Sequence, residues 1–156
     1  MIVRRLFLSG RHSFVGRFGQ DPVTAPMIEV DRIQLVAGRG IAGDRYAERD
    51  FGHKGQVTFF AEETWLKLQE KLACSDRGPE VFRRNILVRG ADLLALVGRD
   101  FELQGVRFRG TEHCKPCLWM DQAFAPGALA ALAAWTAGGL RAQVLTDGWL
   151  EARPAA

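Results

Sequence analysis

Short β-rich segments joined by tight turns are the feature that most restricts how this chain can fold. Two of the turns are Gln104 followed by Gly105 and Asp147 followed by Gly148, each next to residues of strand-like character. Such turns connect antiparallel neighbours, because parallel strands need a long crossover. The pattern therefore favours a mainly β, mostly antiparallel fold of the barrel or sandwich type. We expect strands at 2–8, 28–37, 56–60, 81–88, 101–103, 106–108 and 140–146, with a last one starting at 149.

Two segments have a helical pattern instead. The first, 61–72, has apolar residues at helical spacing, glutamates near its start and lysines towards its end, as the helix dipole favours. The second is rich in alanine, begins at Pro126 and Gly127, and ends at Gly138 and Gly139. The expected fold is thus mainly β and β-barrel-like, with about two helices.

The composition indicates one globular domain covering residues 1–156. Hydrophobic residues make up 47% of the chain, and no apolar run approaches the roughly 20 residues of a membrane-spanning helix. The three cysteines are an odd number without the spacing of a disulfide framework, so we expect reduced thiols and a cytoplasmic location. A formal net charge of +3 does not indicate a nucleic-acid partner, whereas a small anionic ligand would explain clustered arginines.

Two glycine-rich loops are candidate ligand-binding segments. The first, 9–22, is long for a connection, and we expect His12, Ser13 and Arg17 to line a pocket mouth. The second, 38–46, lacks the lysine–serine pair of a P-loop and leads into no helical pattern, which excludes a Walker-type or dinucleotide loop. It provides either backbone N–H groups and arginines for an anion, or only a tight turn with local hydrogen bonds.

Arginines also occur in pairs next to expected strands. On an alternating strand 81–88, Arg83 and Asn85 share one face and Arg84 points to the other, so we expect only one of the two arginines at any given pocket. In the later hairpin, Arg107 and Arg109 lie opposite the apolar face.

The reactive chemistry of the sequence concentrates in a C-x-x-C motif. Cys114 and Cys117 flank Lys115, and His113 precedes them. A cysteine reacts as the thiolate, which neighbouring cations favour. Cys114 and Cys117 are therefore the candidate reactive thiols.

Three interpretations of this motif remain open. As zinc ligands, the two thiols and His113 give three donors where a structural site needs four, although a metal carried on an organic cofactor needs only one protein thiolate. A thiol–disulfide exchanger should open a helix at its motif, but the next expected helix begins near 126. In the third interpretation both thiols simply pack at the end of a strand.

Four short motifs follow one another along the chain. They are Gly40-Ile41-Ala42-Gly43-Asp44-Arg45, Phe82-Arg83-Arg84-Asn85-Ile86, Gly90-Ala91-Asp92-Leu93 and Cys114-Lys115-Pro116-Cys117. In this order they resemble the MOSC domain, which is named for the C-terminal domain of molybdenum cofactor sulfurase. The resemblance extends from about Val3 to Gly148 and implies a strand-rich, β-barrel-like fold associated with the molybdenum cofactor. In that cofactor the dithiolene of a phosphate-bearing pterin holds the metal.

The resemblance also implies roles for individual residues. The cysteine of the family falls on Cys117, as molybdenum ligand or as persulfide sulfur carrier, and Cys114 is a second candidate catalytic residue. The phosphate and the pterin need cations and amide donors, for which Arg83 and Asn85 match the family motif. The full set of expected cofactor-binding residues is Arg83, Asn85, Arg45, Lys54 and Arg109.

The leading hypothesis is a molybdenum-cofactor (molybdopterin) binding domain in which Cys117 is the metal ligand or a sulfur carrier. Whether such a domain is an enzyme stays open at this point; if it is one, the reaction to try first is the reduction of N-hydroxylated substrates with electrons from a separate donor. One alternative is a non-catalytic carrier of cofactor or sulfane sulfur for a partner molybdoenzyme. Another is a C-x-x-C redox or zinc-binding module. No pyridoxal-phosphate site is expected in this chain, so a sulfur carrier would need an external source of sulfur.

Overall fold

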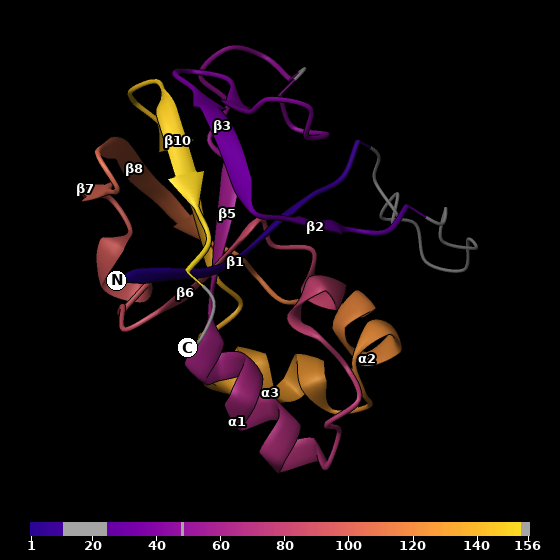
Figure 1. Cartoon of the computed structure of the whole chain (residues 1–156). Helices are drawn as coiled ribbons and strands as arrows, with labels where there is room; N and C mark the ends of the chain where they lie inside the picture. Colours follow the sequence, from indigo (N-terminus) through magenta and orange to yellow (C-terminus); the bar gives the residue numbers. More distant parts are fainter. Residues whose placement is uncertain (11–24, 48, 154–156) are drawn as a thin grey trace.

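The computed structural model describes residues 1–10, 25–47 and 49–153. Within these residues the chain forms ten strands, three α-helices and two short 3-10 helices (Figure 1). The strands are β1 (Ile2–Leu8), β2 (Ile28–Val30), β3 (Arg32–Val36), β4 (Gly40–Ile41), β5 (Val57–Ala61), β6 (Ile86–Arg89), β7 (Asp100–Leu103), β8 (Val106–His113), β9 (Leu140–Val144) and β10 (Gly148–Glu151). The helices are α1 (Glu62–Leu72), α2 (Trp119–Ala123) and α3 (Ala128–Ala134), with 3-10 helices at Pro79–Phe82 and Leu94–Leu96.

The strands form two sheets. The larger has seven strands in the order β2-β1-β6-β5-β9-β8-β7, and the smaller has three in the order β10-β3-β4. Of the strand pairs in the described part of the chain, β5 and β6 alone are parallel, and α1 lies in the crossover between them. The mainly β, mostly antiparallel class is thereby confirmed. The described strands pack as two sheets around a shared core and do not close into one continuous barrel.

The large sheet buries both of its faces along its central strands. Phe59 and Ile86 belong to the core between the two sheets, whereas their neighbours Phe60 and Leu87 belong to the core under the helices. Strands buried on both faces appear in a sequence as continuous apolar runs. Figure 1 shows α1, α2 and α3 grouped together, away from β3 and β10. The C-x-x-C segment connects β8 of the sheet to α2 of this helical group.

Two expected strands differ from the structure. The segment 28–37 does not form one strand but passes from one sheet to the other at Asp31, because β2 pairs with β1 and β3 pairs with β10. The segment 81–88 is a strand only in its second half. Pro79 is the first residue of a 3-10 helix there, a position that suits its fixed φ, and Arg83 then adopts a left-handed φ of 58°.

Both expected helices are present, and a third one follows the C-x-x-C motif. Helix α1 has nearly the predicted bounds, whereas α3 ends at Ala134, well before Gly138. Helix α2 starts at Trp119, where no helix was expected. Its five residues are too few to show a helical period in the sequence.

The two ends of the described chain lie side by side (Figure 1). The backbone N–H of Arg153 donates to the carbonyl oxygen of Val3 at 2.9 Å, which joins the segment after β10 to β1. No helix in the described part of the chain has the length and apolar character needed to cross a lipid bilayer.

Candidate functional site

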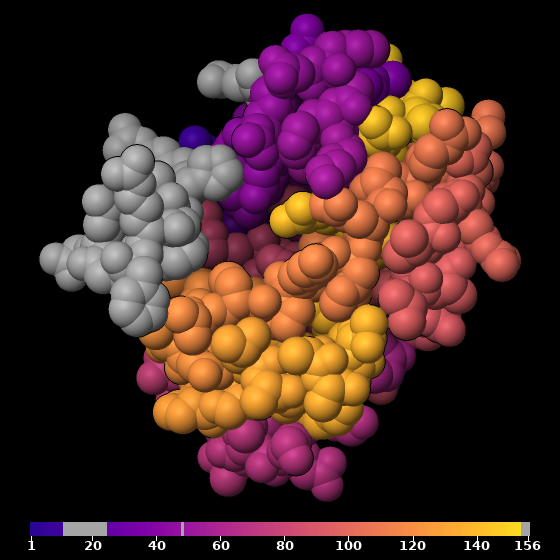
Figure 2. Space-filling model, turned by 180° about the vertical axis from the view of Figure 1, so that it is seen from behind, coloured from indigo at the N-terminus to yellow at the C-terminus, as the bar shows by residue number. Residues whose placement is uncertain are grey.

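A cavity of about 280 Å³ lies where the C-x-x-C segment, the turn after β4 and the turn before β6 meet. Figure 2 shows this face hollowed between the purple segment that follows β4 and the orange segment that follows β8. Five of the ten described lining residues are cationic and none of these ten is acidic, so the cavity has the electrostatic character of an anion site. The lining residues are Arg45, Tyr46, Phe82, Arg83, Arg84, Lys115, Cys117, Trp119, Met120 and Arg141.

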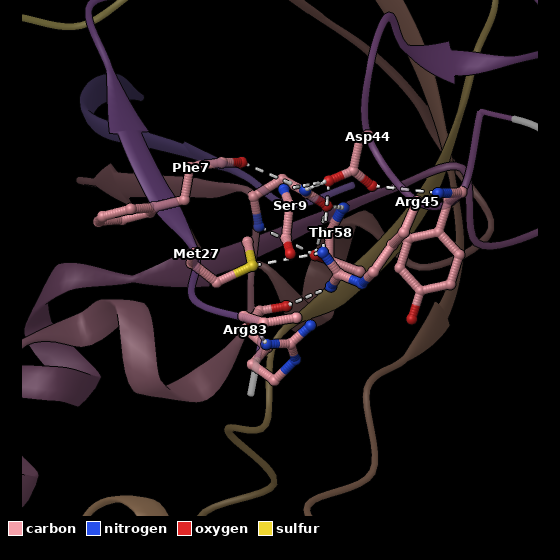
Figure 3. A network of polar contacts seen from close by, with 10 residues as sticks. Phe7, Ser9, Met27, Asp44, Arg45, Thr58 and Arg83 are labelled. Carbon is pink, nitrogen blue, oxygen red and sulfur yellow. Dashed lines mark hydrogen bonds and ion pairs between the residues drawn. The ribbon is translucent and has the colours of Figure 1, made fainter. Parts of the chain in front are cut away.

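The buried carboxylate of Asp44 fixes the turn that carries Arg45. Its Oδ2 accepts hydrogen bonds from the backbone N–H of Ser9 at 3.1 Å and from Arg45 Nη1 at 3.3 Å, and its Oδ1 accepts from the N–H of Tyr46 at 3.2 Å. The side chain of Arg45 is only 3% exposed, so little water competes for this ion pair. Figure 3 shows the carboxylate among these partners. The glycine-rich turn therefore has hydrogen bonds within itself, and Asp44 also connects it to Ser9 at the end of β1.

Asn85 extends the same network behind the cavity wall. Its Nδ2 donates to Asp44 Oδ2 at 3.1 Å and to the carbonyl oxygen of Phe7 at 3.3 Å. Its Oδ1 accepts from the N–H and the hydroxyl of Thr58 at 3.2 and 2.9 Å. Asn85 is fully buried and is not among the lining residues. The structure thus gives this amide the position of a support that joins β1 and β5 to the turn.

Arg83 and Arg84 both line the cavity, whereas the sequence predicted that only one would. The prediction was wrong because Arg83 is not part of an alternating strand but has the left-handed conformation described above. Arg83 Nη1 donates to the carbonyl oxygen of Ala25 at 2.8 Å, and Arg84 Nε donates to that of Gly138 at 3.0 Å. Arg45 Nη2 in turn donates to the carbonyl oxygen of Arg83 at 3.0 Å. These backbone carbonyl oxygens hold the three guanidinium groups in position at the cavity.

Two like charges are held close together at this wall. Burial and, second, the positive charge of Arg45 lower the pKa of Arg83 to about 10. Arg83 is therefore still protonated at neutral pH, although the fold disfavours its charge. In addition, Arg45 Nε is buried and has no hydrogen-bond partner among the described residues. A bound anion would relieve the repulsion and supply the missing acceptor.

The C-x-x-C motif presents its two thiols differently. Cys117 is exposed and lines the cavity, whereas Cys114 is only 2% exposed and does not. The N–H of Cys114 donates to the carbonyl oxygen of Gly139 at 2.8 Å. A Cβ on Gly138 would collide with the carbonyl oxygen of Cys114, so this close approach requires glycine. Gly138 and Gly139, which the sequence pattern predicts as a helix end, therefore hold the backbone of Cys114 in position.

His113 takes part in the same locking contact. Its Nε2 accepts a hydrogen bond from the N–H of Gly138 at 3.0 Å. Burial lowers the pKa of this imidazole, and the charges of Arg84 and Lys115 lower it further, in agreement with a neutral acceptor. Within the described ranges, no group of three or more His, Cys, Asp or Glu residues is placed to hold a metal ion. The described residues therefore offer no set of ligands for a structural zinc ion.

The other residues predicted to bind the cofactor, Lys54 and Arg109, do not line the cavity. Lys54 does not line it but forms an ion pair with Glu112 at 2.8 Å, beside Arg141. Arg109 lies on the exposed hairpin, where its Nε and Nη2 donate to the carboxylate of Asp100 at 2.6 and 3.0 Å. His12, Ser13 and Arg17, predicted at a pocket mouth, lie outside the described residues.

The sequence does not single out several of the lining residues, among them Arg141, Trp119 and Tyr46. Arg141 pairs with Glu112 across β8 and β9, and opposite charges at facing positions of two predicted strands are the signal that could have found it. Trp119, whose Nε1 donates to the carbonyl oxygen of Val81 at 2.8 Å, and Tyr46 supply aromatic surface. Neither aromatic residue has a local sequence signal that distinguishes it from a core residue.

The fold and the cavity define a class of molecule, namely a small sheet-rich domain with one exposed cysteine in a cationic pocket. The family model of the MOSC domain matches residues 47–153 of this chain. Because the match covers more than half of the sequence, the protein belongs to the MOSC domain family. The Gly40 to Arg45 turn lies just before the matched region.

Solved structures share this fold at low sequence identity. The YuaD protein from Bacillus subtilis aligns with a TM-score of 0.70 and 19% identity over 96% of this chain and 90% of its own. YiiM from Geobacillus stearothermophilus aligns with a TM-score of 0.68 and 12% identity over 96% and 70%. YiiM from Escherichia coli gives 0.61 and 15% over 94% of this chain and 65% of its own. No curated protein matches the sequence. These likenesses show the fold.

Proposed function

We propose that this MOSC domain binds a molybdenum–pterin cofactor in the cation-lined cavity, with Cys117 as the thiolate ligand of the metal or as a sulfur carrier. The observation that supports this is the meeting of one exposed thiol with five cationic side chains, in a cavity whose described lining residues include no acid. Such a cofactor brings its own sulfur ligands and the redox chemistry of molybdenum, so the protein needs to contribute only one thiolate.

The described residues fit the anionic part of this group. Arg83 and Arg45 lie together at one wall, and the buried Nε of Arg45 has no hydrogen-bond partner among the described residues. A phosphate oxygen is the acceptor that arginine recognises best. Tyr46 and Trp119 provide flat apolar surface for a ring system. Asp44 keeps Arg45 oriented from behind.

The reaction to test first is oxygen removal from N-hydroxylated compounds. Reduction of an N–OH group to N–H consumes two electrons and two protons and releases one water molecule. The electrons come from a separate donor, which is part of the proposal. In this reaction the residues of the cavity bind the cofactor and keep its anionic end away from solvent.

The ligand role of Cys117 is tested by metal content. In protein expressed in cofactor-competent cells, wild type should contain near-stoichiometric molybdenum by elemental analysis, and Cys117→Ala should lose most of it. Cys114→Ala is the matched control, since that thiol is buried outside the cavity, and it should retain the metal. Full molybdenum in Cys117→Ala would remove the ligand role. Zinc near one equivalent without molybdenum would favour the zinc-binding alternative.

The exposure of Cys117 also fits the carrier alternative. There the Cys117 thiolate attacks the outer sulfur of a donor persulfide, the donor leaves as its thiolate, and the sulfane sulfur remains on Cys117. Cyanide-labile sulfur on Cys117 in mass spectrometry, absent from Cys117→Ala and present in Cys114→Ala, supports this role. Repeated turnover with an artificial electron donor would instead exclude a pure carrier.

A further inference from the structure

A second cavity adjoins the one that holds Cys117. It measures about 400 Å³, and Lys115 and Arg141 line both cavities. A cofactor in the first cavity leaves the second as the neighbouring open space from which a substrate can reach it. The second cavity therefore bears on which substrates the site accepts.

Positive charge dominates this second cavity. Three cations, Lys54, Lys115 and Arg141, face one carboxylate, that of Glu112, and the imidazole of His113 completes the lining. Because burial and nearby cations lower the pKa of His113, the imidazole adds no charge that would change this balance at neutral pH.

His53, which lies outside the lining of this cavity, is also affected by positive charges nearby. The pKa of His53 is lowered first by burial and then by the charges of Arg49, Arg141 and Lys54. The cationic region thus extends from the second cavity over the loop before β5.

Ion pairs with Glu112 orient two of these cations, Lys54 and Arg141. The Glu112 carboxylate accepts from Lys54 Nζ at 2.8 Å and from Arg141 Nη1. The hydroxyl of Thr111 donates to the carbonyl oxygen of Lys54 at 2.6 Å and also contacts that of Arg141 at 3.0 Å. The loop of Lys54 and the strand of Arg141 are thereby joined before any ligand binds. A preorganised site loses less conformational freedom on binding.

We propose that the second cavity is a subsite for an anionic group of the substrate, a carboxylate or a phosphate. The protein then prefers N-hydroxylated compounds that carry such a group over neutral ones. The identity of the substrate rests on the proposed function, but the binding of an anion beside Lys54 does not.

The first experiment measures binding without the cofactor. The cofactor-free full chain is titrated with sulfate, and the amide signals of Glu112 and His113 report the second cavity, whereas those of Arg45 and Arg83 report the first. Lys54→Gln should weaken binding at the second cavity roughly fivefold, the scale of an exposed ion pair, and leave the first unchanged. Lys71→Gln, an exposed lysine on α1, is the matched control. Equal affinity in Lys54→Gln and Lys71→Gln would overturn the subsite.

The second experiment measures selectivity in the cofactor-loaded protein. Benzamidoxime is compared with its 4-carboxy and 4-phosphono derivatives, and kcat/KM should favour the anionic probes roughly fivefold. The ratio of the two anionic probes separates a carboxylate site from a phosphate site. The ratio of kcat/KM for an anionic probe to kcat/KM for benzamidoxime should approach one in Lys54→Gln and in molar salt. Sulfate binding at Lys54 without turnover of any probe would contradict the proposed reaction and leave the anion subsite standing. Turnover of all probes at equal kcat/KM would contradict the subsite and leave the reaction standing.

Discussion

Arg83 and Arg109 are both conspicuous in the sequence, yet they stand in opposite electrostatic situations. Arg109 makes a two-pronged ion pair with Asp100 on an exposed hairpin. Arg83 donates instead to the carbonyl oxygen of Ala25 and lies next to Arg45. Arg109 thus donates to a charged carboxylate, whereas Arg83 donates to a neutral backbone carbonyl oxygen.

The pKa values of the two arginines express this difference. The hydrogen bond with Asp100 raises the pKa of Arg109, because the fold favours its charged form. Burial lowers the pKa of Arg83 to about 10, because the fold disfavours the charged form of this side chain. A guanidinium whose charge the fold opposes gains most from an external anion. Arg83 is therefore the better candidate ligand contact, although Arg109 is closer to the cysteines in the sequence.

The carboxylates behind the two arginine regions provide the largest test of this contrast. Asp44→Asn should destabilise the protein by roughly 3–5 kcal/mol, because it leaves the buried charge of Arg45 without its counter-ion. Urea unfolding followed by circular dichroism measures the change. Asp100→Asn removes an exposed partner of Arg109 and should leave the unfolding midpoint nearly unchanged. Equal midpoints for the two variants would contradict the assignment of Asp44 as the support of the cavity wall.

The arginines themselves give the next largest effect. Arg83→Met should weaken the binding of sulfate or cofactor at the first cavity about tenfold to a hundredfold, the scale of a lost charge-assisted hydrogen bond. Isothermal titration calorimetry measures the affinity, and circular dichroism checks the fold. Arg109→Met is the matched control and should bind as wild type does. Arg83→Lys should recover part of the affinity, since it keeps the charge but not the planar geometry. The reverse ranking of Arg83→Met and Arg109→Met would return Arg109 to the site.

The parts of this contrast that depend on local pattern were predictable from sequence. Arg107 and Arg109 are exposed and Val106 and Phe108 are buried, as period-two alternation on a hairpin requires. The mostly antiparallel class followed from the turns, and the family followed from the order of four short motifs. Cys117 was distinguished from Cys114 only through the family resemblance, because both thiols have the same local spacing.

The parts that depend on tertiary contacts were not predictable. Asp44 and Asn85 are 41 positions apart in sequence, and nothing local indicates that their side chains meet. The left-handed conformation of Arg83, which brings both arginines to one cavity, replaces the strand that its apolar neighbours suggested. Gly138 looked like a helix end because a helix precedes it, but its actual constraint is the carbonyl oxygen of Cys114.

The smallest expected effect is a dependence of sulfate affinity on pH that belongs to Arg83 and not to Arg109. The folded-state pKa of Arg83 is about 10, below the pKa of an arginine in the unfolded chain. The folded protein therefore loses this proton first. The contribution of the group to stability is present above the unfolded pKa and is lost as pH falls through 10.

Anion binding has the opposite dependence, because it needs the protonated form. Sulfate affinity at the first cavity should be constant from neutral pH to about 9 and fall about twofold near pH 10, where half of Arg83 has lost its proton. Calorimetry across this range on wild type and Arg83→Met measures it, and Arg109→Met should follow wild type. Other polar groups line the same cavity, so the diagnostic quantity is the ratio of wild-type to Arg83→Met affinity at each pH. A ratio that stays constant through pH 11 would mean that Arg83 does not contact the anion.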